Sequence, residues 1–458
     1  MFKKFKKILA IFLFFGLLTG PDKLWADDSQ IAFSSSDRIL VIAPHPDDES
    51  LGLGGTLQRA VSAGAQVKVL YVTNGELNEV ASIFYRKRPL FLKSDFIKNG
   101  LIRKKESINA MGMLGIGEDN LTFLGYPDGG MLGIWVKCWG KSKPFRSFFT
   151  RLNKVPYKES LSLGNYYRGD EVVRDFEKAV LSFQPTHVFV TAPFDLNQDH
   201  QATYLYFQVA LMNLNDQLNP VPQVHLYVIH AHQWPKDKKF LPNEELSIPK
   251  HIDWKADVNW DAFSLSSEET AKKSDAILKY KSQISYNRNF LMSFARKNEL
   301  FADYPQEMVK PVHTEQAAGR PGHEKAGQPG DVTYEIDDKF LIIKVPFSSS
   351  LDEMGLLTAY VFSYRKGFMF SDMPKFTFKL FGNKMFVRDG SKSFYDRELI
   401  YLIERNRVLI RIPLKDLKDP DFLFVSTRNA KEDMTLDFGS WRLLEVSKSP
   451  GNPNKALL

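Results

Sequence analysis

The chain has 458 residues, 43% of them hydrophobic and 25% charged, so it can bury a sizeable core and is long enough for two or three domains. Its formal net charge of +7 comes largely from the first 26 residues, which hold five lysines and one aspartate. The remainder carries 56 basic and 53 acidic residues, a net charge of +3. Because that excess is small and no basic stripe with interleaved aromatic residues accompanies it, nucleic acid is not expected as a partner.

The N-terminal segment, residues 1–26, predicts export. A basic start, MFKKFKK, precedes the apolar stretch ILAIFLFFGLL at 8–18, which is short for a bilayer span. The sequence LWA before DDS predicts cleavage after Ala26, but Leu24 matches the small-residue rule poorly, so an uncleaved anchor with membrane association remains the alternative. Cys138 is the only cysteine, which excludes an intramolecular disulfide and fits a periplasmic or secreted protein of a bacterial envelope.

Between residues 38 and 290, apolar strand-like runs alternate with segments of helical pattern. The runs are RILVIAP, VKVLYVTN, LTFLGY, THVFVTAP and VHLYVIHAH. This alternation is typical of βαβ units, in which a mostly parallel sheet is covered by helices on both faces. We therefore predict a doubly wound, Rossmann-like α/β domain over residues 38–303. Functional residues in such sheets gather at the carboxyl ends of the strands.

The motif HPDDE, residues 45–49, follows the first of these strands. Pro44 and Pro46 restrict the backbone of the loop, so its polar side chains lose little conformational entropy when they bind a ligand. A neutral imidazole at His45 and a carboxylate three positions later, Asp48, make half of a zinc site, and a second carboxylate stays free. A charged first turn of a helix is the alternative interpretation of this motif taken alone.

The stretch TAPFDLNQDHQAT, residues 191–203, follows another apolar strand and opens another helix. It brings Asp195, Asp199 and His200 to a strand end, and His200 completes a His, Asp, His set. Three protein ligands with an open fourth position predict a catalytic zinc site, although such a set also accepts other divalent first-row metals. A catalytic zinc acidifies bound water, and the free carboxylate of the first motif can accept the proton.

Residues 135–170 are rich in Lys, Arg and aromatic residues and precede the next helical segment. A long loop near a strand-end site commonly forms a lid or a substrate wall, so we expect this one either to bind an extended or anionic glycan or only to exclude water.

After residue 303 the residue composition and the period of the apolar pattern change. Residues 304–330 carry repeated Pro and Gly and predict a linker or a long exposed loop. From 331 to 446 the apolar pattern has period two in seven or eight short runs, which predicts an antiparallel β-sandwich domain. It is faintly similar to carbohydrate-binding modules, with Trp441, Phe370 and Tyr395 as candidates for stacking on sugars; a purely structural role is the equal alternative.

Four motifs, APHPDDE, RKKE, PFDLNQDH and KYKSQ, occur in an order and spacing that resembles the PIG-L (LmbE-like) family of metal-dependent N-deacetylases. The resemblance covers roughly residues 38–290. It implies hydrolysis of the acetamide of an N-acetylglucosamine-type sugar, as in enzymes that act on N-acetylglucosaminyl phosphatidylinositol or on the sugar precursors of small thiols.

Residue roles also follow from the resemblance. It implies that zinc is bound by His45, Asp48 and His200, and that Asp47 is the general base. It implies sugar contacts for Arg103 and Asp128, for which a surface ion pair with Glu106 and a turn, respectively, are the alternatives. The supporting groups that it implies are Glu49, Glu106 and Asp199, and Asp195 lies in the same motif.

One position departs from the family pattern P-x-D-x-H-x-D-H, because Asn197 replaces the first histidine. An asparagine amide can donate a hydrogen bond to an oxyanion, which contributes on the order of 3 kcal/mol in other hydrolases, but it cannot donate a proton. Two outcomes stay open: slower catalysis, or a proton supplied by a histidine of YVIHAHQWP, for which we name His230, with His232 beside it.

Two classes of function therefore remain. We expect an exported zinc N-deacetylase acting on an N-acetylhexosamine in a glycan, exopolysaccharide or glycolipid. The competing hypothesis is a non-catalytic glycan-binding protein that keeps the metal loop, for which Asn197 is the main argument. An amidase for small sugar–thiol conjugates is a further alternative within the enzyme class.

Overall fold

The computed structural model describes residues 27–28, 31–77, 87, 92–250, 258–304, 307–309, 332–346, 355–404, 407–431, 434–438 and 440–446. The predicted export signal, residues 1–26, and most of the predicted linker lie outside these residues. Within them, no helix is both long enough and apolar enough to cross a membrane.

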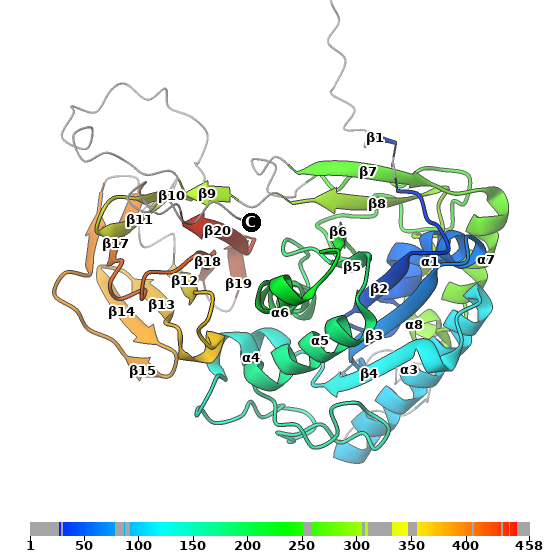
Figure 1. Cartoon of the computed structure of the whole chain (residues 1–458), viewed down its shortest axis with the longest axis horizontal. Helices are drawn as coiled ribbons and strands as arrows, with labels where there is room; N and C mark the ends of the chain where they lie inside the picture. Colours follow the sequence, from blue (N-terminus) through cyan, green and yellow to red (C-terminus); the bar gives the residue numbers. More distant parts are fainter. Residues whose placement is uncertain are drawn as a thin grey trace, which may run out of the picture.

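The N-terminal half is built on one eight-stranded sheet with strand order β1-β7-β8-β6-β5-β2-β3-β4 (Figure 1). Neighbouring strands are parallel except at β8, which is antiparallel to β6 and β7. The prediction of a mostly parallel sheet is therefore confirmed, with an antiparallel addition at one side. The bounds are β1 Asp27–Asp28, β2 Arg38–Ala43, β3 Gln66–Thr73, β4 Leu121–Tyr126, β5 His187–Thr191, β6 Gln223–Tyr227, β7 Asn259–Ser264 and β8 Asn298–Asp303.

The helices form two groups, within which they contact one another. One group contains α1 (Asp48–Ser62), α3 (Lys93–Leu114), α7 (Ser267–Ile277) and α8 (Lys281–Met292), and the other contains α4 (Met131–Lys137), α5 (Gly169–Phe183) and α6 (Gln198–Leu214). Short 3₁₀ turns are η1 Glu118–Asn120, η2 Asn215–Gln217 and η4 Phe370–Asp372. This arrangement agrees with the predicted mixed α/β, doubly wound domain.

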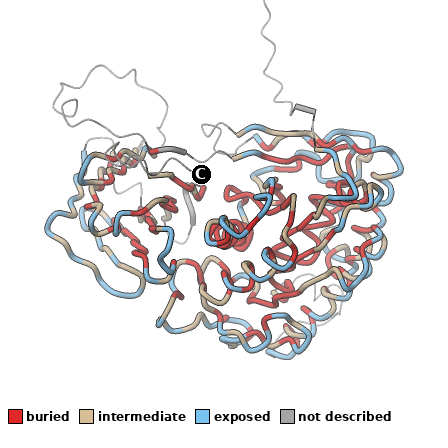
Figure 2. Tube along the Cα trace, viewed as in Figure 1, coloured by how far each residue is buried: buried red, intermediate tan, exposed pale blue. Residues whose placement is uncertain are grey.

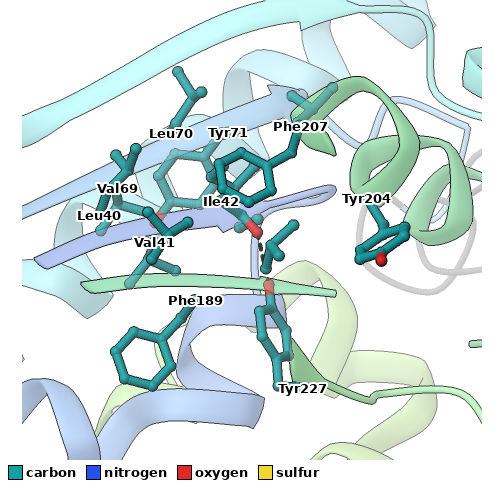
Figure 3. Close-up of a cluster of buried hydrophobic side chains, with 14 of the residues drawn as sticks. Leu40, Val41, Ile42, Val69, Leu70, Tyr71, Phe189, Tyr204, Phe207 and Tyr227 are labelled. Carbon is teal, nitrogen blue, oxygen red and sulfur yellow. Dashed lines mark hydrogen bonds between the residues drawn. The ribbon is translucent and has the colours of Figure 1, made fainter. Parts of the chain in front are cut away.

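The central strands are apolar on both faces, as a parallel sheet between helix layers requires. All five residues of β5 are buried, and Figure 2 shows burial along the inner strands and most of α6. Figure 3 shows Leu40 and Ile42 of β2 packed among aromatic side chains, and the Tyr227 hydroxyl donates to the Ile42 carbonyl at 3.0 Å. The strand ends are therefore held rigidly where they meet the loops of the site.

The C-terminal half consists of two sheets that are antiparallel apart from one strand. The four-stranded sheet has the order β10-β11-β17-β16, and the second has the order β15-β14-β13-β12-β18-β20-β9, with β19 paired to β18. Strand β9 lies inside the predicted linker and pairs in parallel with β20. The bounds are β9 Glu307–Val309, β10 Thr333–Ile336, β11 Phe340–Pro346, β12 Leu356–Tyr364, β13 Lys375–Phe381, β14 Lys384–Asp389, β15 Lys392–Ser393, β16 Ile400–Ile403, β17 Arg407–Pro413, β18 Phe422–Lys431, β19 Met434–Phe438 and β20 Arg442–Val446.

An aromatic cluster joins the two halves around Trp135 of α4. The Trp135 ring lies 5.3 Å from the centroid of Phe370, 5.3 Å from Phe424 and 6.1 Å from Trp441. Trp441 is 1% exposed and Phe370 is 4% exposed, so the suggestion that these two side chains stack on sugars is wrong. They pack against the α/β domain instead, whereas Tyr395 is exposed.

Candidate metal centre and active-site pocket

The polar residues of the site lie in the loops and first helical turns that follow five strands of the sheet. His45 follows β2, Asp128 follows β4, His200 follows β5, and His230 follows β6. Glu76, which accepts a hydrogen bond from the Asp128 amide at 3.1 Å, follows β3. Because these five strands run parallel, their carboxyl ends share one edge of the sheet, where ligands bind in doubly wound folds.

The three predicted metal ligands meet at one point. His45 Nδ1 lies 3.3 Å from Asp48 Oδ2 and 3.2 Å from His200 Nε2, and that Nε2 lies 3.1 Å from Asp48 Oδ2. All three side chains are buried. Ligands about 2.0–2.1 Å from a tetrahedral ion are separated from one another by about 3.3 Å, so this triad has the spacing that a zinc-sized ion requires. His45, Asp48 and His200 form one of two candidate metal clusters among the described residues.

The second cluster shares His45 and lies on its other ring nitrogen. His45 Nε2 is 3.3 Å from Asp128 Oδ1 and 3.3 Å from Asp199 Oδ2. Asp199 also accepts backbone hydrogen bonds from Gly129 at 2.6 Å and Met131 at 3.0 Å. A carboxylate on the far nitrogen of a ligating histidine fixes the ring and its tautomer, so Asp199 has the position of a supporting group.

Asp195 plays the corresponding part for His200. Its Oδ2 lies 3.2 Å from His200 Nδ1, although the contact lacks the angle of a directed hydrogen bond. The same oxygen accepts from the backbone nitrogens of Ile229 and His230 at 2.8 and 2.9 Å. Asp195 therefore links the loop after β6 to the candidate metal ligand.

Asp47 directly precedes α1 and has φ 121°, in the region that favours glycine. A non-glycine residue in this conformation is strained and persists only where its surroundings hold it. Arg103 Nη2 lies 3.1 Å from Asp47 Oδ1, and the Asp47 amide donates to Glu49 Oε2 at 3.1 Å. The strained backbone turns the Asp47 side chain toward the pocket while Asp48 joins the triad.

Glu49 and Glu106 stabilise the surroundings of the site and do not line the pocket. Glu49 accepts hydrogen bonds from the Tyr280 hydroxyl and from Ser50. Glu106 accepts from the Ser282 amide at 2.8 Å and hydroxyl at 2.6 Å, which ties α3 to α8.

Arg103 and Asp128 line the pocket but already have protein partners. The Arg103 guanidinium donates to the Gly75 and Pro46 carbonyls at 2.8 and 2.5 Å in addition to Asp47. Asp128 Oδ2 accepts from the Leu77 amide at 2.8 Å. Their predicted sugar contacts stay predictions, because these side chains also hold the loops in place.

Asn197 and His230 face the same pocket. Asn197 is the N-cap of α6, and its side-chain oxygen accepts from the Asp199 amide at 2.8 Å, which leaves the NH₂ group as its donor. The His230 ring centroid lies 5.0 Å from that of His200, and the ring stacks on Phe290 at 5.7 Å. His232 is exposed and does not line this pocket.

The pocket has a volume of ≈ 270 Å³. One wall is formed by α8, for which no sequence pattern predicts a place in the pocket. Helix α8 departs from helical geometry at Asn287 (φ −128°, ψ 36°), inside this wall. The pocket is lined by His45, Asp47, Asp48, Leu51, Leu77, Arg103, Asp128, Asn197, Ile229, His230, Gln283, Tyr286, Asn287, Phe290 and Leu291.

Burial and neighbouring charges separate the two adjacent aspartates. Burial and, to a lesser extent, the Asp48 and Glu49 carboxylates raise the pKa of Asp47 to about 8 against the opposing effect of Arg103. Burial also disfavours ionisation of Asp48, but His200 and His45 hold the pKa of Asp48 well below its usual range. Asp48 is thus suited to bind a cation, and Asp47 to exchange a proton near neutral pH.

The histidines of the triad hold protons in the absence of a cation. Burial lowers the pKa of His200, but the Asp195 and Asp48 carboxylates outweigh burial and raise it to about 9. Asp128 and Asp199 likewise raise the pKa of His45 well above its usual range, against the effect of burial. A divalent cation can replace these protons among the same carboxylates, so its binding is expected to release protons.

A family described as "PIG-L: GlcNAc-PI de-N-acetylase" matches residues 40–211. Among curated proteins, a 1D-myo-inositol 2-acetamido-2-deoxy-alpha-D-glucopyranoside deacetylase of Kineococcus radiotolerans is 40% identical over 104 residues, 22% of this chain and 27% of that protein. A Mycothiol S-conjugate amidase of Streptomyces coelicolor is 31% identical over 96 residues, 20% of this chain and 31% of that protein. The chain thus spans about a quarter to a third of these relatives.

Solved structures give weaker likenesses. An N,N'-diacetylchitobiose deacetylase from Pyrococcus horikoshii is 18% identical, covers 58% of this chain and 84% of its own, and has a TM-score of 0.36. A deacetylase of the teicoplanin biosynthesis pathway is 19% identical, covers 58% of this chain and 96% of its own, and has a TM-score of 0.37. Scores of this size do not by themselves establish a shared fold. The family match and the curated relatives confirm the resemblance recognised in the sequence: the chain contains a PIG-L family domain at residues 40–211.

Proposed function

We propose that this protein is a metal-dependent N-deacetylase that hydrolyses the acetamide of an N-acetylhexosamine. The observation that carries this proposal is the pairing of a ligand-spaced His45, Asp48, His200 triad with Asp47, a neighbouring carboxylate that lines the pocket. The curated relatives support it, because most are named as deacetylases of a 2-acetamido sugar.

The donor set of two imidazoles and one carboxylate suits zinc, and it accepts other first-row divalent ions as well. When bound, such an ion polarises the acetyl carbonyl and lowers the pKa of a water molecule so that it can attack. Asp199 and Asp195 hold the two histidines for that role through their far ring nitrogens.

Asp47 transfers the proton. Its carboxylate takes a proton from the attacking water and returns it to the departing amine, so that acetate and a free amino sugar leave. The Arg103 guanidinium keeps a fraction of Asp47 ionised near neutral pH and fixes its direction. The Asn197 NH₂ group donates a hydrogen bond to the developing oxyanion, and His230, which lines the same pocket, is the second candidate donor.

We propose a terminal sugar as the substrate unit. Small-molecule pockets usually measure about 300–1,000 Å³, and a volume of ≈ 270 Å³ suits one sugar residue better than an enclosed polymer. Tyr286 and Phe290 of α8 provide apolar surface on one side, and Asn287 and Gln283 provide polar groups beside them. Export of the protein and an envelope glycan, exopolysaccharide or glycolipid as substrate rest on the sequence of residues 1–26 alone.

Two alternatives have specific observations in their favour. The amidase relative from Streptomyces coelicolor favours a small sugar–thiol conjugate. Asn197 in place of the family histidine favours a glycan-binding protein without turnover.

For the C-terminal half we propose a β-sandwich, since buried residues of both sheets, among them Ile343, Val408 and Phe376, belong to one hydrophobic cluster.

The test is acetate release by the zinc-loaded full chain from N-acetylglucosamine oligomers, an N-acetylglucosaminyl inositol and an acetylated sugar–thiol conjugate. Asp47→Asn is the blank. We expect acetate from at least one N-acetylglucosamine substrate and none with the variant. Cleavage of the thiol conjugate alone would select the amidase, whereas glycan binding without acetate from any substrate would select the binding protein.

A further inference from the structure

The segment between α4 and α5, residues 140–168, exposes cations and apolar side chains together. Its only acidic residue, Glu159, forms an ion pair with Lys104 at 2.7 Å. The exposed cations of this segment are Lys141, Lys143, Arg146, Arg151, Lys154 and Lys158. Its fixed positive charge is therefore not neutralised by acids of the same segment. Figure 1 shows the segment along the lower edge of the molecule, below α4 and α5.

Two adjacent phenylalanines project from a tight turn in this segment. The turn is closed by the Ser147 amide donating to the Leu152 carbonyl at 2.9 Å and by the Arg151 amide donating to the Ser147 carbonyl at 3.0 Å. Phe148 is 69% exposed, and Phe149 is 39% exposed. A rigid turn that keeps two large apolar side chains in water has a cost in free energy that binding to an apolar phase would remove.

The N-terminus of α3 extends this apolar surface. The Phe149 ring lies 5.6 Å from Phe96, and Leu92, one helical turn before Phe96, is 65% exposed. Lys93, beside Leu92, is also exposed. We call Leu92, Phe148, Phe149, Arg146 and Arg151 the docking patch. The nearest acid on this helix end, Asp95, is 8% exposed and is directed at the Leu92 amide.

We propose that the docking patch binds the surface of an anionic lipid bilayer. Leucine and phenylalanine side chains partition into the interface between headgroups and acyl chains, and arginines beside them attract acidic headgroups. An acidic glycan fits less well, because sugars stack on open aromatic faces, and the Arg151 guanidinium covers Phe148 at 4.8 Å from its ring centroid.

Docking by this patch would bring the catalytic pocket close to the membrane. Arg103, which lines the pocket, follows Phe96 by seven residues on the same helix, about 10 Å along its axis. The docking patch stands independently of the proposed deacetylation, since its evidence lies outside the metal centre.

The experiment places an environment-sensitive fluorophore on the full chain at Phe148→Cys, with no substrate present. Cys138 is buried, so the introduced thiol is labelled selectively. The matched control is the same label at Phe381→Cys in β13, because Phe381 is also 69% exposed. Each protein is titrated with phosphatidylcholine vesicles that contain or lack phosphatidylglycerol.

We expect a blue shift at position 148 with phosphatidylglycerol, a weaker shift without it, and none at position 381. Adding Arg146→Gln and Arg151→Gln should raise the lipid concentration for half-maximal shift roughly 30-fold. No shift at position 148, or equal shifts at both positions, would overturn the proposal. Any vesicle binding that remained would then be attributed to the N-terminal segment. Binding of soluble polygalacturonate at position 148 without a response to vesicles would overturn it in favour of a glycan.

Discussion

Arg103 and Asp47 form a buried ion pair, with Nη2 3.1 Å from Oδ1, between α3 and the loop that carries the candidate metal ligands. The same guanidinium donates to carbonyls of the loops after β2 and β3. Arg103 therefore determines both the direction of the Asp47 side chain and its charge. This pair distinguishes the carboxylate that exchanges a proton from Asp48, which joins the metal triad.

Arg103→Gln should move the acidic limb of the kcat/KM profile to higher pH. The base acts when it is deprotonated, and the positive charge of Arg103 lowers the pKa of Asp47 against the effect of burial. Removing that charge raises the pKa of Asp47, by about one unit or more, so more of the enzyme is protonated at neutral pH. A pH–rate profile checks this, and an acidic limb that stays in place or moves down would contradict the assignment of Asp47 as the base.

Asp195→Asn should weaken metal binding about 10- to 100-fold, because the Asp195 carboxylate lies 3.2 Å from the far nitrogen of His200 and supports its charge. The matched control is Asp175→Asn, a buried carboxylate that accepts hydrogen bonds from Tyr126 and Ser162 away from the site. The control should lower thermal stability and leave metal affinity unchanged. Competition titration with a chelating dye measures both affinities; an equal loss in the two variants would assign Asp195 a purely structural role.

Asn197 has two separable properties, the cap oxygen and the amide donor. Asn197→Asp keeps a cap oxygen for the Asp199 amide but removes the donor, so we expect the fold to be retained and kcat to fall about 100-fold. Asn197→His restores a group that donates both a hydrogen bond and a proton, and should fold with equal or higher turnover. Loss of metal binding or of folding in the histidine variant would show that position 197 has been matched to the family pattern incorrectly.

Lys375 should make stability depend on pH. Burial lowers the pKa of Lys375 from 10.5 to about 7. The Lys375 ammonium is buried at the domain contact, against the rings of Trp139 and Phe370. Above both values the lysine is neutral in the folded and unfolded states. As the pH falls from about 10.5 to 7, only the unfolded chain gains the proton, so the wild type loses up to about 5 kcal/mol relative to Lys375→Met. Below pH 7 the difference becomes constant.

Denaturant unfolding at a series of pH values measures that difference. The exposed Lys379 on the same strand provides the control, and Lys379→Met should follow the wild type at every pH. Parallel stability curves for the wild type and Lys375→Met would mean that Lys375 keeps its proton in the folded protein.

Much of the α/β domain could be predicted from the sequence because its strands are continuous apolar runs, each followed by a helical pattern. The motifs around His45 and His200 could be placed together because both follow such strands, and parallel strands end at one edge. Strands β7 and β8 were not anticipated, since NWDAFS and NELFAD combine polar and apolar residues without a parallel-strand signature.

Other features depend on contacts that no local pattern records. The α8 wall of the pocket, with Tyr286 and Phe290, is more than two hundred residues from His45 in sequence. From its place in a strand-rich stretch, Trp441 could be predicted to be an exposed aromatic residue that stacks on a sugar. It is buried instead, because it packs against Trp135 from the other half of the chain. The positive φ of Asp47 likewise follows from the hydrogen bonds around it, and not from its residue type.

The most direct test of the division of roles measures metal content and acetate release together in three variants, Asp47→Asn, His45→Ala and His200→Ala. We expect Asp47→Asn to retain one metal ion per chain and to lose most of the rate, whereas both histidine variants lose the metal. Equal metal loss in all three variants, or a rate near wild type in Asp47→Asn, would contradict this division of roles.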